Sequence, residues 1–432
     1  MDAPLPSTIQ RRTLPLYVQV LIGVALGTML GIIFKTKPIL FGLKNDHLGQ
    51  LGMLVIKLLR AMAIPLILFS ILDSFVKTGI TIRHGGKLIV ICVINVSIAM
   101  AIGLTIMNTL KPGLRWHGKL DQMVASMPER PSADAMIRDS HKGTLSPMEN
   151  IASYVPRSMV DPFSENNVIT VVLIAVLAGA ALRRVRSQEG GALSIRAAEE
   201  VIDAGYRVLV QMLEWIVLTI PFAVFGVVAK VVGEQGLQVF SFLWIFLATI
   251  LLGMIIHALG YYPLVAWLVG GKSPRRYLGI GADAIVTGLS CNSSLATVPI
   301  TLKCLDRMGV SPQSARLSAC IGTNLNNDGI TLYEAMAALF VLQAVGASPT
   351  LSAQLAIVLA SIMAGAGIAG IPEAGLVMLP LVLQAAGLSD AVIAVVLPLI
   401  MTVDWIIARC RSAVNVMADM LVAILLDAGT GR

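Results

Sequence analysis

The sequence is poor in charge, in aromatic rings and in cysteine. Of its 432 residues, 13% are Asp, Glu, Lys or Arg and 5% are aromatic, whereas soluble proteins average about 25% charged residues. The hydrophobic share is 56% and the mean hydropathy is +0.82. This composition excludes the ordinary soluble class, and we predict an integral, multi-pass membrane protein surrounded by lipid.

The scarcity of cysteine and histidine excludes further classes. The five cysteines lie in or beside apolar segments without CxxC or Cys/His spacing, so neither a disulfide framework nor a zinc site is indicated. None of the five histidines lies in the polar core of the C-terminal part, and no nucleophile–base pair is evident there. We therefore predict a protein that is not an enzyme and has no organic cofactor.

The charges that are present follow a membrane topology. Basic residues gather in the N-terminus and in the connections at 77–87, 183–197 and 271–276. By the positive-inside rule these segments are cytoplasmic, so the net charge of +7 reflects topology and predicts no nucleic-acid partner. A long polar stretch at 111–166 is predicted to be an extracytoplasmic insertion. Six apolar segments are predicted to span the membrane, at about 14–34, 48–76, 87–110, 166–182, 205–232 and 239–270.

Beyond residue 276 the apolar segments are interrupted at their centres. The segment 278–300 is broken by small and hydroxyl residues, and the segment 351–388 by a Gly-rich run at 365–375. We predict two helical hairpins that enter the membrane from opposite sides, with a broken helix at 312–345 between them. Close helix packing would explain the glycines, but not the Asn and Asp residues at 324–328. Such an inverted repeat is typical of the binding site of a secondary transporter.

The last apolar helix carries a polar stripe at membrane depth. Asp404, Ala408, Arg411, Asn415 and Asp419 fall on one face at helical spacing, between uncharged flanks. Each Asp or Arg at the centre of a span costs roughly 2.5 to 3.5 kcal/mol to insert, so the stripe must face protein or a water-filled cavity. Two interpretations are open. The stripe forms a functional site, or Asp404 and Arg411 form an internal ion pair that only holds helices together.

Four motifs in order resemble one transporter family. The serine-rich run at 293–301, the run Asn326 to Ala335 (similar to NMDGTALYEA), the tip at 369–375 and the helix 404–419 are similar to the glutamate transporter family, the dicarboxylate/amino acid:cation symporters. The resemblance implies an all-α membrane protein with eight transmembrane helices plus two re-entrant helical hairpins, an inverted repeat and an elevator-type transporter fold. It also implies a homotrimer.

The same resemblance divides the chain into two parts. Residues 1–270 would supply six transmembrane helices, which contribute the scaffold, the trimer contacts and part of the transport domain. Residues 271–432 would form the transport core, made of hairpin 1, broken helix 7, hairpin 2 and helix 8. The implied activity is symport of a small anionic substrate driven by a cation gradient.

Residue roles are carried over from the matching positions. Arg411 matches the arginine that pairs with the substrate's distal carboxylate, a task that suits a guanidinium fork. Glu334 matches the glutamate that carries a proton in the animal transporters. The other implied substrate positions are Asn415, Ser294, Asn292, Ser412, Ala408, Ile330 and the backbone of Gly370 and Ile371. The implied sodium ligands are Gly322, Asn326, Asn415 and Asp419 for one site and Asp328 for another.

Departures from the family pattern bear on the substrate. Ala408 stands where members that carry acidic amino acids have an aspartate for the α-amino group, and Ile330 replaces a threonine near the distal carboxylate. Arg411, the partner for a carboxylate, is kept, whereas the aspartate that would pair with an ammonium group is missing. This combination favours a C4-dicarboxylate as the substrate. The alternative is an acidic amino acid, glutamate or aspartate, bound through Glu373 or Asp404.

Further departures bear on the coupling ion, which we predict to be sodium, protons or both. Three ligand positions of one sodium site carry Cys92, Asn95 and Val96, and two positions near another carry Asn327 and Ile368. Full three-sodium coupling is therefore not expected. An ion channel is the alternative from a different class, but a filter motif is not evident and Arg411 beside Asn415 favours an anion clamp. The compact length suggests a bacterial inner membrane.

Overall fold

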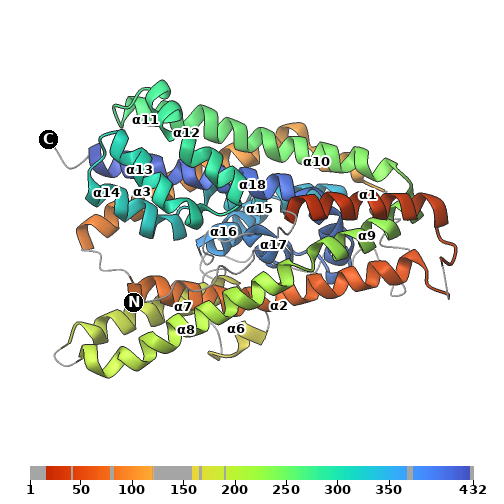
Figure 1. The fold of residues 1–432 in the computed structure, drawn as a ribbon, viewed down its shortest axis with the longest axis horizontal. Coiled ribbons are helices and arrows are strands. Elements are labelled where there is room, and N and C mark those ends of the chain that lie inside the picture. Colours follow the sequence, from red (N-terminus) through yellow and green to blue (C-terminus); the bar gives the residue numbers. More distant parts are fainter. Residues whose placement is uncertain are drawn as a thin grey trace, which may run out of the picture.

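The protein is described by a computed structural model at residues 16–39, 42–77, 82–118, 120, 158–164, 168–188, 191–366 and 373–428. These residues form helices joined by short turns and contain no β-strand (Figure 1). The all-helical prediction therefore agrees with the part of the chain that is described. Most of the long helices run along the longest axis of the molecule, with α18 among them (Figure 1).

The helical elements up to residue 268 include the segments predicted to span the membrane. They are α1 (Leu16–Phe34), α2 (Asn45–Lys77), α3 (Ile82–Leu110), η1 (Pro112–Trp116), α6 (Asp161–Ser164), α7 (Val168–Arg186), α8 (Gly191–Val217), α9 (Ile220–Gln235), α10 (Gln238–Ile255) and, after the π-helical turn η3 (Ile256–Tyr261), α11 (Tyr262–Leu268).

The remaining elements build the two hairpins, the broken helix and the last helix. They are α12 (Pro274–Cys291), α13 (Ser294–Arg307), α14 (Pro312–Arg316), the turns η4 (Leu317–Ile321) and η5 (Gly322–Asn324), α15 (Asp328–Ala344), α16 (Leu351–Ala366), α17 (Ala374–Ala385) and α18 (Asp390–Ala428). The arms α12 and α13 pack on each other, as do α16 and α17, so both predicted hairpins are present as helix pairs.

Four helices in the described residues are long and apolar enough to cross a membrane by length and composition: α2, α3, the α10–α11 unit and α18. A fifth candidate is the pair α8 and α9, which is bent by 41° at its break. The segment predicted to span at 205–232 is therefore a pair of helices with a break between them and not one continuous helix. Pro221 in the first turn of α9 has no N–H to extend α8, so the helix is interrupted at Leu218 and Thr219.

Two further sequence boundaries differ from the structure. The connection predicted at 183–197 is mostly helical, since α7 continues to Arg186 and α8 begins at Gly191. The first hairpin is longer than 278–300, because Ser273 caps α12 by accepting a hydrogen bond from the Arg276 N–H at 3.3 Å. Its second arm ends at Arg307.

Helices α1, α2, α7, α8 and α9 pack as one group, which we call the scaffold group. Helix α1 lies against α9 through a glycine face at a spacing of four residues. A Cβ at Gly23 would lie 2.6 Å from the Pro221 carbonyl oxygen, and one at Gly27 would lie 2.6 Å from that of Phe225. Only glycine allows this approach, the small-residue packing that is typical of membrane helices.

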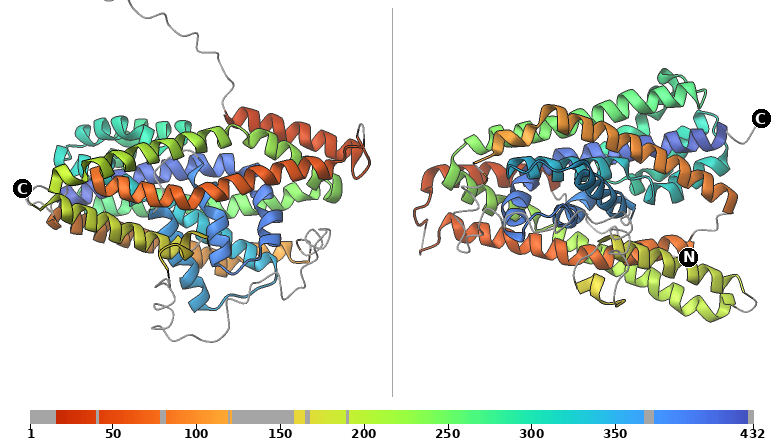
Figure 2. Two further views of the ribbon diagram at one scale, coloured as in Figure 1. Left: turned by 90° about the horizontal axis from the view of Figure 1, so that it is seen from below. Right: turned by 180° about the vertical axis from the view of Figure 1, so that it is seen from behind.

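The second group, which we call the core group, surrounds α15 and α18 and includes α3, α10 to α14, α16 and α17. All residues of α15 are buried. The two hairpins differ in their neighbours: α16 packs on α7 and α17 on α2, whereas α12 and α13 pack mainly within the core group. Seen from below, α16 and α17 lie to one side of the long helices (Figure 2).

The segment predicted as an insertion at 111–166 is described only at its two ends. Its first turn, η1, is fixed to α15: the Gly113 N–H donates to Oε1 of Gln343 at 3.1 Å, and the Trp116 ring lies edge-on to Phe340 at 5.5 Å between centroids. Its last part contains α6. The prediction for residues 121–157 falls outside the described residues.

Candidate functional site

Arg411 is the centre of the buried polar stripe of α18. Its Nη1 donates to Oδ1 of Asp404 at 3.0 Å and its Nη2 to Oδ2 at 3.1 Å, which forms a bidentate ion pair across two turns of the helix. Its Cζ lies 4.3 Å from the centroid of the Tyr333 ring on α15, and the residue is 2% exposed. The internal ion pair considered from the sequence is therefore present. A guanidinium has five N–H groups, so this pair leaves three for another carboxylate.

Helix α17 approaches the same guanidinium from the second hairpin. A Cβ at Gly375, in the first turn of α17, would collide with the Arg411 guanidinium. Glycine at this position thus lets the backbone of the hairpin lie directly against the charged group. The predicted contacts of Gly370 and Ile371 lie outside the described residues.

The tip of the first hairpin faces the polar stripe. Helix α12 ends where Asn292 adopts a left-handed conformation with φ +52°, and Ser293 then caps α13 by accepting from the Ala296 N–H at 3.2 Å. Ser412 Oγ on α18 donates to Asn292 Oδ1 at 3.2 Å. Ser294 is buried and its hydroxyl accepts from Thr323 Oγ1 at 3.4 Å. The structure therefore brings together Asn292, Ser294 and Ser412.

Glu373 connects the tips of the two hairpins. Its Oε1 accepts a hydrogen bond from Asn292 Nδ2 at 2.9 Å, and the residue is 5% exposed. Like Asn292 it has a left-handed backbone, with φ +58°. The hairpins are separated by 81 residues at this contact, so only the folded structure reveals it.

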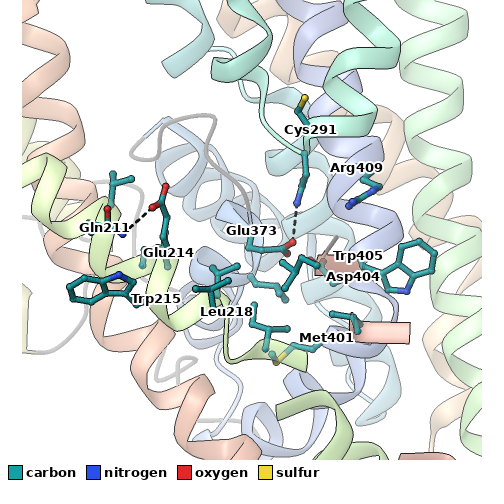
Figure 3. A pocket seen from close by; sticks show the side chains of 18 of the residues that line it. Gln211, Glu214, Trp215, Leu218, Cys291, Glu373, Met401, Asp404, Trp405 and Arg409 are labelled. Carbon is teal, nitrogen blue, oxygen red and sulfur yellow. Dashed lines mark hydrogen bonds between the residues drawn. The ribbon is translucent and has the colours of Figure 1, made fainter. Parts of the chain in front are cut away.

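A cavity of about 600 Å³ lies between the scaffold group and the core group. On the core side its wall includes Asn292, Glu373, Asp404 and Arg409, and on the scaffold side it is largely apolar. Figure 3 shows the Glu373 carboxylate turned toward the first hairpin, with Asp404 nearby and Glu214 on a facing helix. Polar groups at one wall of an otherwise apolar cavity are typical of a small-molecule site.

Asn415 joins α18 to the start of α15. Its Oδ1 accepts from the Gly329 N–H at 2.8 Å, and its Nδ2 donates to Asn327 Oδ1 at 3.1 Å. Asn327 in turn donates to the Gly365 carbonyl at 2.9 Å, which ties in the second hairpin. Asn415 therefore has a structural task that the sequence did not reveal.

Several buried oxygen atoms near the break before α15 suit a hard cation. Asn326 Oδ1, Asp419 Oδ1 and Asp328 Oδ1 are buried and have no hydrogen-bond partner among the described residues. Gly322 forms the turn just before, and its carbonyl accepts from Asn326 N at 2.8 Å. Amide and carboxylate oxygens of this kind match the donors that hard cations prefer, so the donor set fits sodium.

One residue near these oxygens was missed by sequence reasoning. The expectation that no histidine lies in the polar core is wrong, because Nε2 of His257 lies 3.3 Å from Asp328 Oδ2. Tyr262 donates its hydroxyl to the same oxygen at 2.9 Å. His257 lies in η3 and Tyr262 is the first residue of α11, and both are far from Asp328 in sequence. No local motif within 271–432 indicates this contact, because His257 is 71 residues away from Asp328.

The remaining predicted positions are also in the core group. Glu334 is fully buried on α15, and its two carboxylate oxygens have no hydrogen-bond partner in the described part of the chain. Ala408 and Ile330 are buried and offer only apolar side chains.

The altered sodium-ligand positions have neighbours of their own. Asn95 is buried and accepts from the Tyr261 hydroxyl at 2.8 Å, and Cys92 is buried close by on α3. Val96 packs against the main hydrophobic core. Ile368 lies outside the described residues.

Comparison with known proteins finds relatives among the excitatory amino acid transporters, two of which match over most of the chain. Mouse excitatory amino acid transporter 3 is 26% identical over 437 residues, which cover 92% of this chain and 82% of the relative. A putative sodium-dependent excitatory amino acid transporter of Caenorhabditis elegans, glt-4, is 25% identical and covers 94% and 88%. Mouse excitatory amino acid transporter 1 is 33% identical over a shorter stretch, 54% of this chain and 42% of the relative.

A family model covers residues 16–428, almost the whole chain, and its description is sodium:dicarboxylate symporter family. This match agrees with the resemblance of the four motifs, and it makes the protein a member of a membrane transporter family whose coupling ion is sodium. With its buried polar stripe, its two hairpins and this match, the chain belongs to the sodium:dicarboxylate symporter family.

Proposed function

We propose that the protein is a sodium-coupled symporter for an acidic amino acid. The observation that carries the proposal is the cavity between the scaffold group and the core group, whose wall includes Glu373 and Asp404, the ion-pair partner of Arg411. A guanidinium with free N–H groups suits a substrate carboxylate, and a nearby carboxylate suits an ammonium group. The names of the relatives support this substrate more than the dicarboxylate that Ala408 favours.

A C4-dicarboxylate is the second candidate. The buried methyl group of Ala408 lies between Asp404 and Arg411 on the polar stripe and offers no partner to an amino group. A dicarboxylate would need no such partner. Against it stands the second carboxylate, Glu373, because an added anion near the site opposes a doubly negative substrate.

Further substrate contacts follow from the hairpin tips. The hydroxyl groups of Ser294 and Ser412 and the amide of Asn292 are close enough to the tip-to-tip contact to bind carboxylate oxygens once the substrate is present. The backbone of Gly370 and Ile371 is proposed to complete the second gate, and Ile330 and Ala408 to line the apolar side. Asn415 is proposed to act on substrate binding indirectly, because its hydrogen bonds to Gly329 and Asn327 hold the start of α15 in place.

The sodium site is proposed at Gly322, Asn326, Asn415 and Asp419, with Asp328 belonging to a second one. The unpartnered oxygens of Asn326 and Asp419 support it. Asp419→Asn should lower the affinity for sodium on the order of tenfold or more, because the charged donor is replaced by a neutral one. Sodium-dependent stabilisation in thermal unfolding measures it without transport. Unchanged stabilisation by sodium would contradict the assignment.

Proton coupling through Glu334 is a separate proposal. The supporting observation is a fully buried carboxyl group without a hydrogen-bond partner among the described residues. Glu334→Gln keeps the shape and removes the titration. An unchanged pH dependence of transport in this variant would show that Glu334 does not carry the coupled proton.

The architecture is proposed from the family. Eight transmembrane helices and two re-entrant hairpins would form an elevator-type homotrimer in a cell membrane, with the bacterial inner membrane suggested by the compact length alone. Residues 1–270 would then carry the scaffold and part of the transport domain, and 271–432 the transport core. The separate packing of the scaffold and core groups is compatible with this division, with α3 and α10 joining the core.

The test is uptake of labelled aspartate and labelled succinate into proteoliposomes, each with and without an inward sodium gradient. Sodium-driven aspartate uptake is expected. Succinate uptake alone would replace the proposal by the dicarboxylate candidate. Uptake that neither saturates nor shows exchange would indicate a channel. Uptake that does not depend on the sodium gradient would indicate that protons are the coupling ion.

A further inference from the structure

The tips of the two hairpins meet through two residues with a left-handed backbone conformation. Asn292 and Glu373 have φ of +52° and +58°, a region that L-residues other than Asn, Asp and Gly seldom adopt. Asn tolerates this conformation, whereas a glutamate there is strained and persists only where the surroundings over-determine it. Glycine would be the unstrained choice at position 373. A glutamate at this position therefore indicates a task for its side chain.

The carboxylate of Glu373 faces groups that a substrate can replace. Its hydrogen-bond partner, Asn292 Nδ2 at 2.9 Å, is a neutral amide, and Asn292 is itself held by Ser412 on α18. Glu373 and Asp404, which Figure 3 labels, border the same cavity as Asn292. A neutral donor is a weaker partner for a carboxylate than a charged one, so an ammonium group entering the cavity can displace it.

The other carboxylates near the cavity are less suited to an amino group. Asp404 has both oxygens in the bidentate pair with Arg411. Glu214 lies on the scaffold helix α8, where Gln211 donates to it at 3.1 Å. Glu334 does not border the cavity. Of the two carboxylates that line the core side of the cavity, Asp404 is paired with Arg411, and Glu373 is the one that remains.

We propose that Glu373 is the specificity-determining residue that binds the substrate's amino group, in place of a carboxylate on α18. The inference rests on the proposed function. The ammonium group replaces Asn292 as the partner of Glu373 Oε1, so recognition of the amino group and release of the tip-to-tip hydrogen bond are one event. The carboxylate of the site thus comes from the second hairpin.

The first experiment compares aspartate and succinate binding at saturating sodium in the wild-type protein, Glu373→Gln, Ala408→Asp and the double variant. Glu373→Gln should shift the aspartate-to-succinate affinity ratio toward succinate by at least tenfold. The double variant, which moves the carboxylate from the hairpin to α18, should restore the aspartate-to-succinate affinity ratio to near its wild-type value. An unchanged ratio in Glu373→Gln would overturn the inference whatever happened to either affinity alone.

A second variant separates selectivity from folding. Glu373→Gly relieves the left-handed strain and removes the carboxylate, so its melting temperature should rise or stay level while the aspartate-to-succinate ratio falls at least tenfold. A residue with only a structural role would instead lose stability and keep the ratio, and that result would contradict the inference. Wild-type protein that binds succinate but no aspartate would show that the proposed function itself is wrong.

Discussion

The helix pairs α1–α9 and α15–α18 both bring backbone against backbone, but different groups fill the contact. In α1, the glycines at 23, 27 and 31 lie against carbonyl oxygens of α9, while Leu26, Met29 and Ile33 are exposed on another face. In α15, a Cβ at Gly329 would lie 2.7 Å from the Arg411 carbonyl oxygen, and Asn415 accepts from the Gly329 N–H at 2.8 Å.

The glycine contacts of the two helix pairs have different roles: packing in the scaffold pair, and the placement of polar site residues in the core pair. In the scaffold pair, glycine allows close van der Waals contact between two helices. In the core pair, glycine lets α18 approach closely enough for an amide to reach the backbone beside Arg411 and the candidate cation oxygens. We therefore expect an equal increase in side-chain volume to change stability in the first pair and to change both stability and ligand binding in the second.

The largest effect is expected when the ion pair between Arg411 and Asp404 on α18 is broken. Arg411→Met leaves Asp404 buried without its cation, which should destabilise the fold by about 3 to 5 kcal/mol and abolish measurable substrate binding. Thermal unfolding and binding titrations measure the two effects. Adding Asp404→Asn to the same variant should recover part of the stability and none of the binding. Recovery of binding in that double variant would show that Arg411 does not hold the substrate.

A smaller effect is expected when the core pair is forced apart. Gly329→Ala places a methyl group against the Arg411 carbonyl and the Asn415 amide, which should cost about 1 to 3 kcal/mol of stability. It should also weaken substrate affinity by roughly tenfold or more, because 1.4 kcal/mol of lost interaction is a factor of ten. Titration of substrate into the folded variant measures this. Normal affinity would mean that the core pair tolerates separation as the scaffold pair does.

The scaffold pair provides the matched case. Gly27→Ala should also cost about 1 to 3 kcal/mol, since the new Cβ would lie 2.6 Å from the Phe225 carbonyl oxygen. The substrate affinity of the folded fraction should be unchanged. The same thermal and binding assays apply, and a loss of affinity comparable with that of Gly329→Ala would remove the distinction between the pairs.

The smallest effect is expected at a glycine with open space around it. A Cβ at Gly279, within α12, would meet no other atom within 4 Å. Gly279→Ala should stabilise the helix by roughly 0.5 to 1 kcal/mol, because alanine loses less backbone entropy than glycine in a helix. A melting temperature below that of the wild-type protein would indicate a contact on this face of the first hairpin.

Local pattern accounts for the parts that the sequence alone predicts. The helical spacing of Asp404, Arg411 and Asn415 places them on one face, and the small and polar residues after 288 predict the break in the first hairpin. Insertion cost then requires that face to be buried. These inferences depend on neighbours within a few turns, and they agree with the described helices. The predicted roles of the individual site residues remain predictions.

Only the tertiary structure decides which of these segments touch. It pairs Asn292 with Glu373 across 81 residues and places His257 beside Asp328 across 71. It also bends α8 against α9. Helical periodicity fixes the face on which a side chain lies, but it carries no information about the partner helix. That choice depends on the shapes and small residues of both surfaces together, and it exists only once the helices have packed.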